Sequence, residues 1–341
     1  MDDAALRRWL TDLCAVDTTS GQEDAGLDPL QALLRALGAD VELQPVAPGR
    51  TNVLARWGAP RVLLTTHLDT VPPFIAPRWE GDVLWGRGAC DAKGQAVAQL
   101  AAIDALVRRG ARGLAWLGVV GEETDSAGAQ AALALRPALP DLAAVIDGEP
   151  TEGALATGQR GVVHVRLRCR GRAAHSGTPE RGRSALWPLL DWLAALRGLP
   201  QATDAELGPE LWNLGLLRGG EAPNVVPAHA EADLLLRTLP GSRLLEDVRR
   251  LAPPDADVEV LLDEPPDRYP PVPGFPRAAV PFGSDAPRLR ALAPGGAVVL
   301  AGPGTITVAH SPDERLGLDE LRAGVELNAR LAAGFLDLPS A

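Results

Sequence analysis

The chain has 341 residues, 46% of them hydrophobic, which suffices for one large core or for a large and a small domain. Its net charge of −11 is spread along the sequence and disfavours nucleic acid and anionic membranes as partners. No apolar run approaches the roughly 20 residues that span a bilayer, and the first residues do not resemble a secretory signal. The three cysteines lie far apart, which argues against a disulfide framework. We therefore expect a soluble, cytoplasmic protein.

The first half of the chain alternates expected helices and strands. Helices are expected at residues 2–16 and 23–37, and a long Ala-rich helix follows Gly94. The expected strands are short apolar runs bounded by polar or turn residues, at 41–46, 52–57, 61–66, 114–120 and 142–146. Strands that alternate with helices of this length predict an α/β fold with a mainly parallel sheet covered by helices on both faces.

The pattern changes near Gly158. Strands and helices follow in the order β-α-β-β-α-β, at 162–170, 184–196, 211–217, 230–239, 242–251 and 258–262. This order predicts a small ferredoxin-like domain. A Pro-rich connector leads back to the alternating strand and helix pattern of the first half, and a last helix is expected at 318–335. We therefore predict a catalytic domain split into residues 1–159 and 269–341, with a smaller domain, residues 160–268, inserted into it.

Polar side chains follow two of the buried strands. His67 and Asp69 come after the third expected strand, and a carboxylate beside a histidine is the usual partner of a zinc-bound imidazole. A lone histidine at a strand end is also common as a structural residue. Glu122 and Glu123 follow the fourth strand, where adjacent buried carboxylates repel each other unless a cation relieves them. Because open α/β sheets place their chemistry at the carboxyl ends of strands, both pairs are candidates for one site.

Three further residues extend this candidate site. Asp91 lies in a Gly-rich stretch before the long helix, where it could instead be an N-cap. Glu149 follows the strand at 142–146, and His310 lies on a loop rich in turn formers. Nitrogen and oxygen ligands without thiolate suit two zinc ions, with cobalt or manganese as substitutes. A bridging carboxylate would hold the ions roughly 3.5–4 Å apart, and an unliganded glutamate could act as general base.

With these residues in place, the chain resembles the co-catalytic zinc aminoacylase and peptidase family. That family holds acetylornithine deacetylase, succinyl-diaminopimelate desuccinylase, carboxypeptidase G and bacterial di- and tripeptidases. The matching stretches follow the family's order over essentially the whole chain: TTHLDTVPP, GRGACDAKGQ, VVGEETDSAGA, DGEPT, GRAAHSGTPE, APNVVP and GPGTITVAHSPDE. The resemblance implies a zinc-peptidase-like fold with an inserted lid domain.

The resemblance also implies a role for each candidate residue. His67 and Glu149 would hold one zinc, Glu123 and His310 the other, and Asp91 would bridge the two. Glu122 matches the family's general base. Asp69 matches the carboxylate that orients the first histidine.

The inserted domain of this family is a lid and usually the dimer interface, so we expect a homodimer. His175 matches a lid histidine that reaches the partner subunit's site and helps polarise the scissile carbonyl. Arg237 and Asn224 match lid residues that grip the substrate carboxylate, a task that suits the two-pronged guanidinium of arginine. Arg160 is a further candidate for the same role.

The substrate is expected to be a small N-acyl amino acid or a short peptide. The stretch GPGTITVAHSPDE is most similar to the acetylornithine deacetylase branch, so removal of acetyl from N-acetylornithine, a step in arginine biosynthesis, is the expected reaction. The alternatives are a dipeptidase or carboxypeptidase, a succinyl-diaminopimelate desuccinylase, and a hydrolase that releases lysine or ornithine from a carrier protein. A non-catalytic metal-binding protein is the remaining alternative, and the presence of every catalytic position argues against it.

Overall fold

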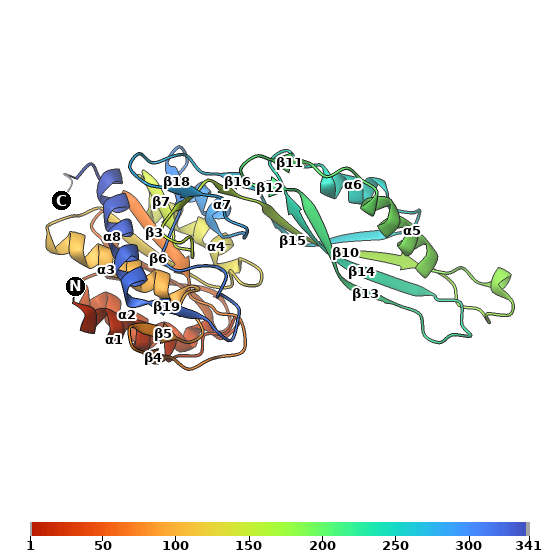
Figure 1. Cartoon of the computed structure of the whole chain (residues 1–341), viewed down its shortest axis with the longest axis horizontal. Coiled ribbons are helices and arrows are strands. Elements are labelled where there is room, and N and C mark those ends of the chain that lie inside the picture. Colours follow the sequence, from red (N-terminus) through yellow and green to blue (C-terminus); the bar gives the residue numbers. More distant parts are fainter. Residues whose placement is uncertain (1, 339–341) are drawn as a thin grey trace. The chain divides into compact units, whose positions relative to one another are not determined.

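The structure, a computed structural model, describes residues 2–338. The chain forms two compact units, each described by itself below (Figure 1). Unit 1 comprises Met1–Thr157, Tyr269–Val280 and Ser284–Ala341, and unit 2 comprises Gly158–Arg268 and Pro281–Gly283. The predicted boundaries lie after residues 159 and 268, whereas the units divide the chain after residues 157, 268, 280 and 283. The roles of the two units as catalytic domain and lid stay predictions.

Unit 1 is built on a six-stranded sheet with the spatial order β1-β2-β6-β3-β7-β18. In that order the strands are β1 (Asp40–Ala47), β2 (Arg50–Trp57), β6 (Leu114–Val119), β3 (Val62–His67), β7 (Ala144–Asp147) and β18 (Ala297–Leu300). The last four pair in parallel, and only β2 runs against both of its neighbours. Both β3 and β6 are buried along their whole length, which explains their continuous apolar runs. The predicted α/β class with a mainly parallel sheet is confirmed.

Helices cover both faces of this sheet (Figure 1). On one side lie α1 (Asp3–Cys14), α2 (Leu27–Ala36), α3 (Lys93–Arg108) and α8 (Leu318–Phe335), and on the other side lie α4 (Ala127–Ala132) and α7 (Ala286–Leu289). The small side chains of the Ala-rich α3 let it pack closely against α1, α8 and β3, so most of its residues are buried. The expected helix at 23–37 starts later than predicted, because a 3-10 turn at Glu23–Gly26 precedes α2.

A small three-stranded sheet in unit 1 was not predicted, because its strands are only three residues long. Its order is β19-β5-β4, formed by β4 (Arg78–Glu80), β5 (Val83–Trp85) and β19 (Arg315–Gly317). Trp85 at the end of β5 pairs with Arg315 at the start of β19. The chain that leaves β5 toward Asp91 therefore begins beside the chain that arrives from His310.

Unit 2 is a four-stranded antiparallel sheet with two helices on one face. Its elements follow the chain as β10 (Gly161–Arg170), α5 (Leu186–Arg197), β13 (Leu211–Gly219), β14 (His229–Thr238), α6 (Leu244–Arg250) and β15 (Asp257–Glu264). The spatial order β13-β14-β10-β15 and the β-α-β-β-α-β sequence confirm the predicted ferredoxin-like domain. Burial alternates along β10: Val163, Val165 and Leu167 face the helices, and basic residues occupy the other face.

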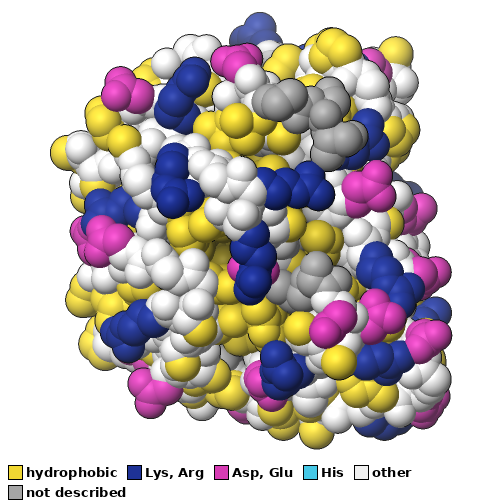
Figure 2. Space-filling view, turned by 90° about the vertical axis from the view of Figure 1, so that its left-hand side faces the viewer, with side chains coloured by type: hydrophobic (Ala, Val, Ile, Leu, Met, Phe, Trp, Pro, Cys, Tyr) yellow, Lys and Arg dark blue, Asp and Glu magenta, His cyan; other side chains and the backbone are white. Residues whose placement is uncertain are grey.

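The surface of the molecule carries charges of both signs. Figure 2 shows that on the face of unit 1 turned to the left in Figure 1, arginine side chains are interspersed with Asp and Glu, so neither sign dominates there. Among the described residues, no helix combines the length and the apolar character that crossing a bilayer would require.

Candidate metal centre

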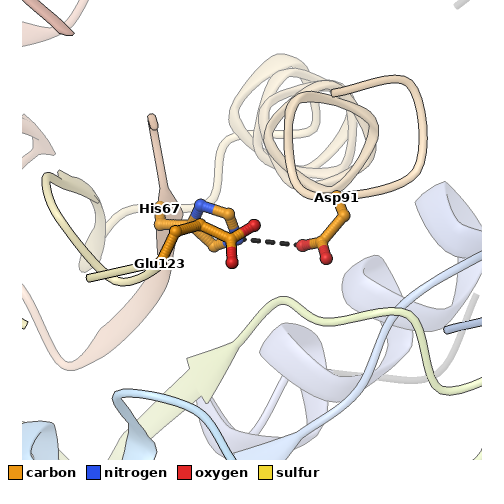
Figure 3. Close-up of side chains that lie close together, drawn as sticks. All are labelled: His67, Asp91 and Glu123. Atoms are coloured by element: carbon orange, nitrogen blue, oxygen red, sulfur yellow. Dashed lines mark hydrogen bonds and ion pairs between the residues drawn. The ribbon is translucent and has the colours of Figure 1, made fainter. Parts of the chain in front are cut away.

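Three of the predicted ligands converge at one edge of the main sheet of unit 1 (Figure 3). His67 ends β3, Glu123 follows β6, and Asp91 lies on the loop before α3. One ligand atom from each of the three lies within 4.8 Å of those of the other two. Since β3 and β6 are parallel neighbours, their carboxyl ends meet at the same edge of the sheet, and this places His67 near Glu123.

Asp91 lies between two histidines. Its Oδ1 is 2.9 Å from Nε2 of His67, and its Oδ2 is 3.3 Å from Nε2 of His310. The same His310 nitrogen is 2.8 Å from Oε1 of Glu123. The N-cap of α3 is Ala92 and no side chain caps the helix, so the alternative role of Asp91 as N-cap is wrong. A carboxylate whose two oxygens face two separate imidazoles has the arrangement of a ligand shared by two cations.

Asp69 fixes the orientation of His67. Nδ1 of His67 is 2.9 Å from the backbone carbonyl oxygen of Asp69 and 3.5 Å from its carboxylate. These acceptors favour the proton on Nδ1 and direct the other nitrogen, Nε2, toward Asp91. The Asp69 carboxylate also accepts hydrogen bonds from the hydroxyl of Ser20 and from the backbone N–H groups of Glu122 and Glu123.

The site is rich in buried carboxylates. Burial, together with the neighbouring charges of Asp91 and Glu122, raises the pKa of Glu149 well above its ordinary value. Burial likewise raises the pKa of Glu122, to which the charges of Asp285, Glu123 and Asp91 add. The positively charged groups of the protein therefore do not balance the negative charge of Glu122, Glu149 and their neighbours. A divalent cation supplies the missing positive charge, and the nitrogen and oxygen donors are those that zinc accepts.

The pKa values of the two histidines are raised as well, which favours their charged form. Hydrogen bonds to Asp91 and Glu123 raise the pKa of His310 to about 10. Burial lowers the pKa of His67, but the carboxylates of Asp69 and Asp91 outweigh burial, so the pKa lies well above its ordinary value. Without a bound metal, the protonated imidazoles of His67 and His310 thus supply the positive charge that a cation would otherwise supply.

Glu149 belongs to the same group of charges but lies outside the trio that meets within 4.8 Å. It follows β7, and the segment before it is tied to β3: the backbone N–H of Gly148 donates to the carbonyl of Thr65 at 2.8 Å, and the Thr66 hydroxyl donates to the carbonyl of Gly148 at 2.8 Å. The structure therefore places Glu149 at the end of the strand beside His67.

His310 has an unusual backbone conformation. Its φ is +60°, in the left-handed region that few residues other than glycine adopt. The Ser311 hydroxyl donates to the carbonyl of Val308 at 2.7 Å and accepts the N–H of Asp313 at 3.1 Å, which closes the loop on both sides of the histidine. A strained residue held in this way is typical of a functional site.

Several charged residues around the site were not predicted. Asp147 is buried, which raises the pKa of its carboxyl to about 7, and the Ser284 side chain donates a hydrogen bond to it. Arg50 forms two hydrogen bonds with Asp125, of 2.9 and 2.8 Å, and so braces the loop that carries Glu122 and Glu123. Asp147 is the first residue of the motif DGEPT, but no local sequence pattern links Arg50 to Asp125.

Two of the predicted substrate-contacting residues lie together in unit 2. His175 forms a β-bridge with Val225, and the backbone carbonyl of Asn224 accepts the N–H of Ser176 at 2.9 Å. Nδ1 of His175 is 3.0 Å from the N–H of Gly177, which donates to it. With Nδ1 accepting, a neutral ring carries its proton on Nε2, which is then a donor.

Arg237 and Arg160 form a second pair in unit 2. Burial and the positive charge of Arg160 lower the pKa of Arg237. Arg160 donates to the carbonyl of Pro209 at 2.9 Å. No carboxylate of the described residues pairs with either guanidinium. Two adjacent, partly buried guanidinium groups without an acidic partner favour an anionic ligand.

Comparisons with known proteins agree on one family. Residues 63–334 match the family described as peptidase family M20/M25/M40. A protein of Aspergillus clavatus named probable carboxypeptidase is 37% identical to this chain, covering 96% of it and 81% of the relative. A solved M20 family metallo-carboxypeptidase from Sulfolobus solfataricus matches with a TM-score of 0.81 at 17% identity, over 99% of this chain and 100% of its own. A Bacillus subtilis protein described as a dinuclear metal binding peptidase of the M20 family matches with a TM-score of 0.73 at 17% identity, over 99% of each chain. At these identities the two structural matches show the fold alone.

Proposed function

The chain belongs to peptidase family M20/M25/M40, and we propose that it is a metal-dependent carboxypeptidase acting on short peptides or N-acyl amino acids. The observation that carries the proposal is the position of Asp91 between His67 and His310, with Glu122 beside them. The relative named probable carboxypeptidase supports the choice of substrate class. So do the unpaired guanidiniums of Arg160 and Arg237, since a carboxypeptidase substrate presents a free carboxylate.

We propose that the site holds two divalent cations, zinc in the first instance and cobalt or manganese as substitutes. His67 and Glu149 would bind one ion, His310 and Glu123 the other, and Asp91 both. The solved relative described as a dinuclear metal binding peptidase supports this assignment. When bound, such ions polarise a carbonyl and lower the pKa of a water molecule.

Glu122 is the proposed general base. Its carboxylate lies in the charge cluster but is not a member of the trio around Asp91, so it is available for proton transfer. Burial raises its pKa well above the ordinary value, which makes the carboxylate a stronger proton acceptor. We propose that Glu122 takes a proton from the attacking water and delivers it to the leaving amine. Asp69 holds its backbone in place for this step.

The residues of unit 2 would recognise the substrate. We propose that Arg237, with Asn224 and Arg160, binds the substrate carboxylate. His175, with a donor at Nε2, would stabilise the oxyanion that forms at the scissile carbonyl. These roles stay predictions until variants of unit 2 are assayed.

Removal of acetyl from N-acetylornithine is the second candidate function. Its support is the stretch GPGTITVAHSPDE, which carries His310 and is most similar to the acetylornithine deacetylase branch. The same catalytic residues would act, because both reactions hydrolyse an amide next to a substrate carboxylate.

We also propose that two copies of the chain associate through unit 2. One edge strand of its sheet, β13, exposes Leu214, Leu216 and Leu217, and helix α5 exposes Trp187 (68%) and Leu190. An edge strand with unpaired backbone groups and exposed leucines is suited to pairing with an identical strand.

The test is a comparison of four substrates with metal-loaded and chelator-stripped protein. The substrates are an N-blocked dipeptide, the same dipeptide with an amidated C-terminus, a free dipeptide and N-acetylornithine. We expect metal-dependent turnover to be fastest on the N-blocked dipeptide and absent on its amide. Fastest turnover of N-acetylornithine would favour the second candidate, and equal turnover of the amide would contradict carboxylate recognition.

A further inference from the structure

A buried ion pair between Arg87 and Glu314 lies beside the candidate metal centre and takes no part in the proposed chemistry. Both side chains are almost fully buried, at 2% and 0% exposed, and Nη1 of Arg87 donates to Oε2 of Glu314. Burying a charge pair costs desolvation free energy, so its presence within the core calls for a local reason.

The second carboxylate oxygen of Glu314 holds the loop that carries Asp91. Oε1 accepts hydrogen bonds from the backbone N–H groups of Gly88 at 2.9 Å, Cys90 at 3.2 Å and Asp91 itself at 3.1 Å. The backbone N–H of Gly86 donates to the carbonyl of Glu314 at 3.0 Å. A single carboxylate therefore fixes the backbone of Asp91 and of the loop that leads to it.

Gly88 shows how closely this loop is held. Its φ is +82°, a conformation that favours glycine, and a Cβ there would lie 2.9 Å from a side-chain carbon of Lys93 and 3.0 Å from one of Thr70. At Gly88 the loop therefore packs closely against these two side chains. Its path is set by Glu314 on one side and by these side chains on the other.

Arg87 extends the same connection to the loop of His310. Its guanidinium contacts the backbone carbonyl of Ser311, the residue after His310, at 3.4 Å. Its Nε contacts the carbonyl of Pro73, on the segment that follows His67 and Asp69, at 3.4 Å. Glu314 itself lies four residues after His310. The ion pair therefore joins the backbones of the three segments that carry Asp91 and its two neighbouring histidines.

We propose that Arg87 and Glu314 are positioning residues that set the distance between Asp91 and His310 before any metal arrives. The inference rests on the proposed function, since it assigns these residues to the metal centre. Preorganised ligands bind metal more tightly because they lose less freedom on binding, and partners of metal ligands typically contribute 10- to 100-fold in affinity. The two residues touch neither the substrate nor the reacting atoms.

The test uses Glu314→Gln in the full-length chain. This change removes the charge that faces Arg87 and one acceptor, while the side chain keeps its size. We expect Zn²⁺ to bind 10- to 100-fold more weakly in competition with a chromophoric chelator. We also expect the visible absorption of the Co²⁺-loaded protein, which reports ligand geometry, to change.

Two controls separate positioning from stability. Glu320→Gln is the matched control, because Glu320 also accepts a backbone N–H, that of Gly317 at 2.8 Å, but within residues 2–338 it forms no hydrogen bond or ion pair with a loop that carries a proposed ligand. Leu34→Ala truncates a fully buried side chain of α2, so it lowers thermal stability without touching the site. Both controls are expected to keep the Zn²⁺ affinity of the wild type within about threefold, the resolution of the competition measurement, since neither touches a ligand loop.

Wild-type affinity and an unchanged Co²⁺ spectrum in Glu314→Gln would overturn the inference. If that variant does not fold, Arg87→Lys tests the inference instead. Lysine keeps the positive charge but lacks the forked donors that reach the carbonyls of Ser311 and Pro73. Weaker Zn²⁺ binding in a stable Arg87→Lys supports the inference, and wild-type binding overturns it. Absence of metal binding by the wild type would contradict the proposed function and with it this inference.

Discussion

The carboxylate of Asp69 accepts a hydrogen bond from the backbone N–H of Glu122 at 3.1 Å. The same carboxylate lies 3.5 Å from Nδ1 of His67. One side chain thus orients a proposed metal ligand and also holds the backbone of the proposed general base. This connects two steps, metal binding and proton transfer, that involve separate residues at the ends of neighbouring strands.

Asp69→Asn should therefore impair both steps. Asparagine keeps one acceptor oxygen but loses the charge that favours the correct tautomer of His67. We expect metal affinity and kcat each to fall by about 10- to 100-fold. Chelator competition and steady-state kinetics measure the two effects. Asp17→Asn, an exposed change in unit 1, is the control, and an Asp69→Asn enzyme with unchanged kcat would contradict the double role.

Glu122→Gln should separate proton transfer from metal binding. Glutamine cannot accept the proton of the attacking water, so kcat should fall by about 100- to 10,000-fold, the usual contribution of a general base. Metal content, measured by elemental analysis, should match that of the wild type. The change Glu42→Gln, at a half-buried residue on the edge strand β1, should leave both properties intact. Substantial activity in Glu122→Gln would remove the assignment of this residue as general base.

Metal binding should release protons. The pKa of His310 is raised to about 10, so its imidazole is protonated at neutral pH when no metal is bound. A ligating imidazole is neutral, so the proton has to leave as the metal enters. The apparent affinity for the metal should therefore rise with pH up to about the raised pKa. Below that pKa, each unit by which the pH is lowered should weaken binding by about tenfold for every proton released.

Calorimetry in buffers of different ionisation enthalpy measures this exchange. At pH 7.5 we expect at least one proton released per chain on loading with Zn²⁺. His164→Gln, a change in unit 2, should leave the number unchanged. Binding without proton release would show that the imidazole of His310 is not the ligand.

Arg237→Ala should weaken binding of substrates that carry a free carboxylate. Loss of a hydrogen bond to a charged group costs about 1.5–3 kcal/mol, so KM should rise by about 10- to 150-fold. Arg218→Ala, which removes an arginine that pairs with Glu231 elsewhere in unit 2, is the matched control. A KM unchanged from the wild type would exclude Arg237 from carboxylate recognition.

The proposed dimer depends on the edge strand β13. Leu216 and Leu217 are 45% and 47% exposed, so replacing both with glutamate should leave the folded chain intact and oppose association. Leu261→Glu is the control, because Leu261 is 41% exposed on β15, the opposite edge of the same sheet. Light scattering after size exclusion should show dimers for the wild type and Leu261→Glu, and monomers for the double variant. A monomeric wild type would contradict the proposal.

The sequence alone predicted the parts of the site that depend on local pattern. Apolar runs ending in a polar residue placed His67 and Glu123 at strand ends, and parallel pairing of β3 and β6 brings such ends together. The contacts of Arg87 with Glu314 and of Arg50 with Asp125 were not predictable in this way. Each joins residues far apart in the chain, 227 and 75 positions respectively, and no periodicity or spacing encodes which partners meet.

Short elements were missed for a related reason. The three-residue strands β4, β5 and β19 are too brief to show an alternating pattern, although their pairing places the loops of Asp91 and His310 side by side. The alternative role of Asp91 as an N-cap could not be decided from the sequence, because a cap and a ligand can occupy the same place before a helix. The structure decides it, because the N-cap of α3 is Ala92 and the carboxylate of Asp91 faces His67 and His310.

Removing and restoring metal tests the central claim most directly. The wild-type chain would be stripped with a chelator, and turnover of an N-blocked dipeptide would be followed as Zn²⁺ is added back. If Asp91 is shared by two ions, activity should vanish on stripping and return in full at two Zn²⁺ per chain. Full activity in the stripped protein, or full recovery at one Zn²⁺ per chain, would contradict the account.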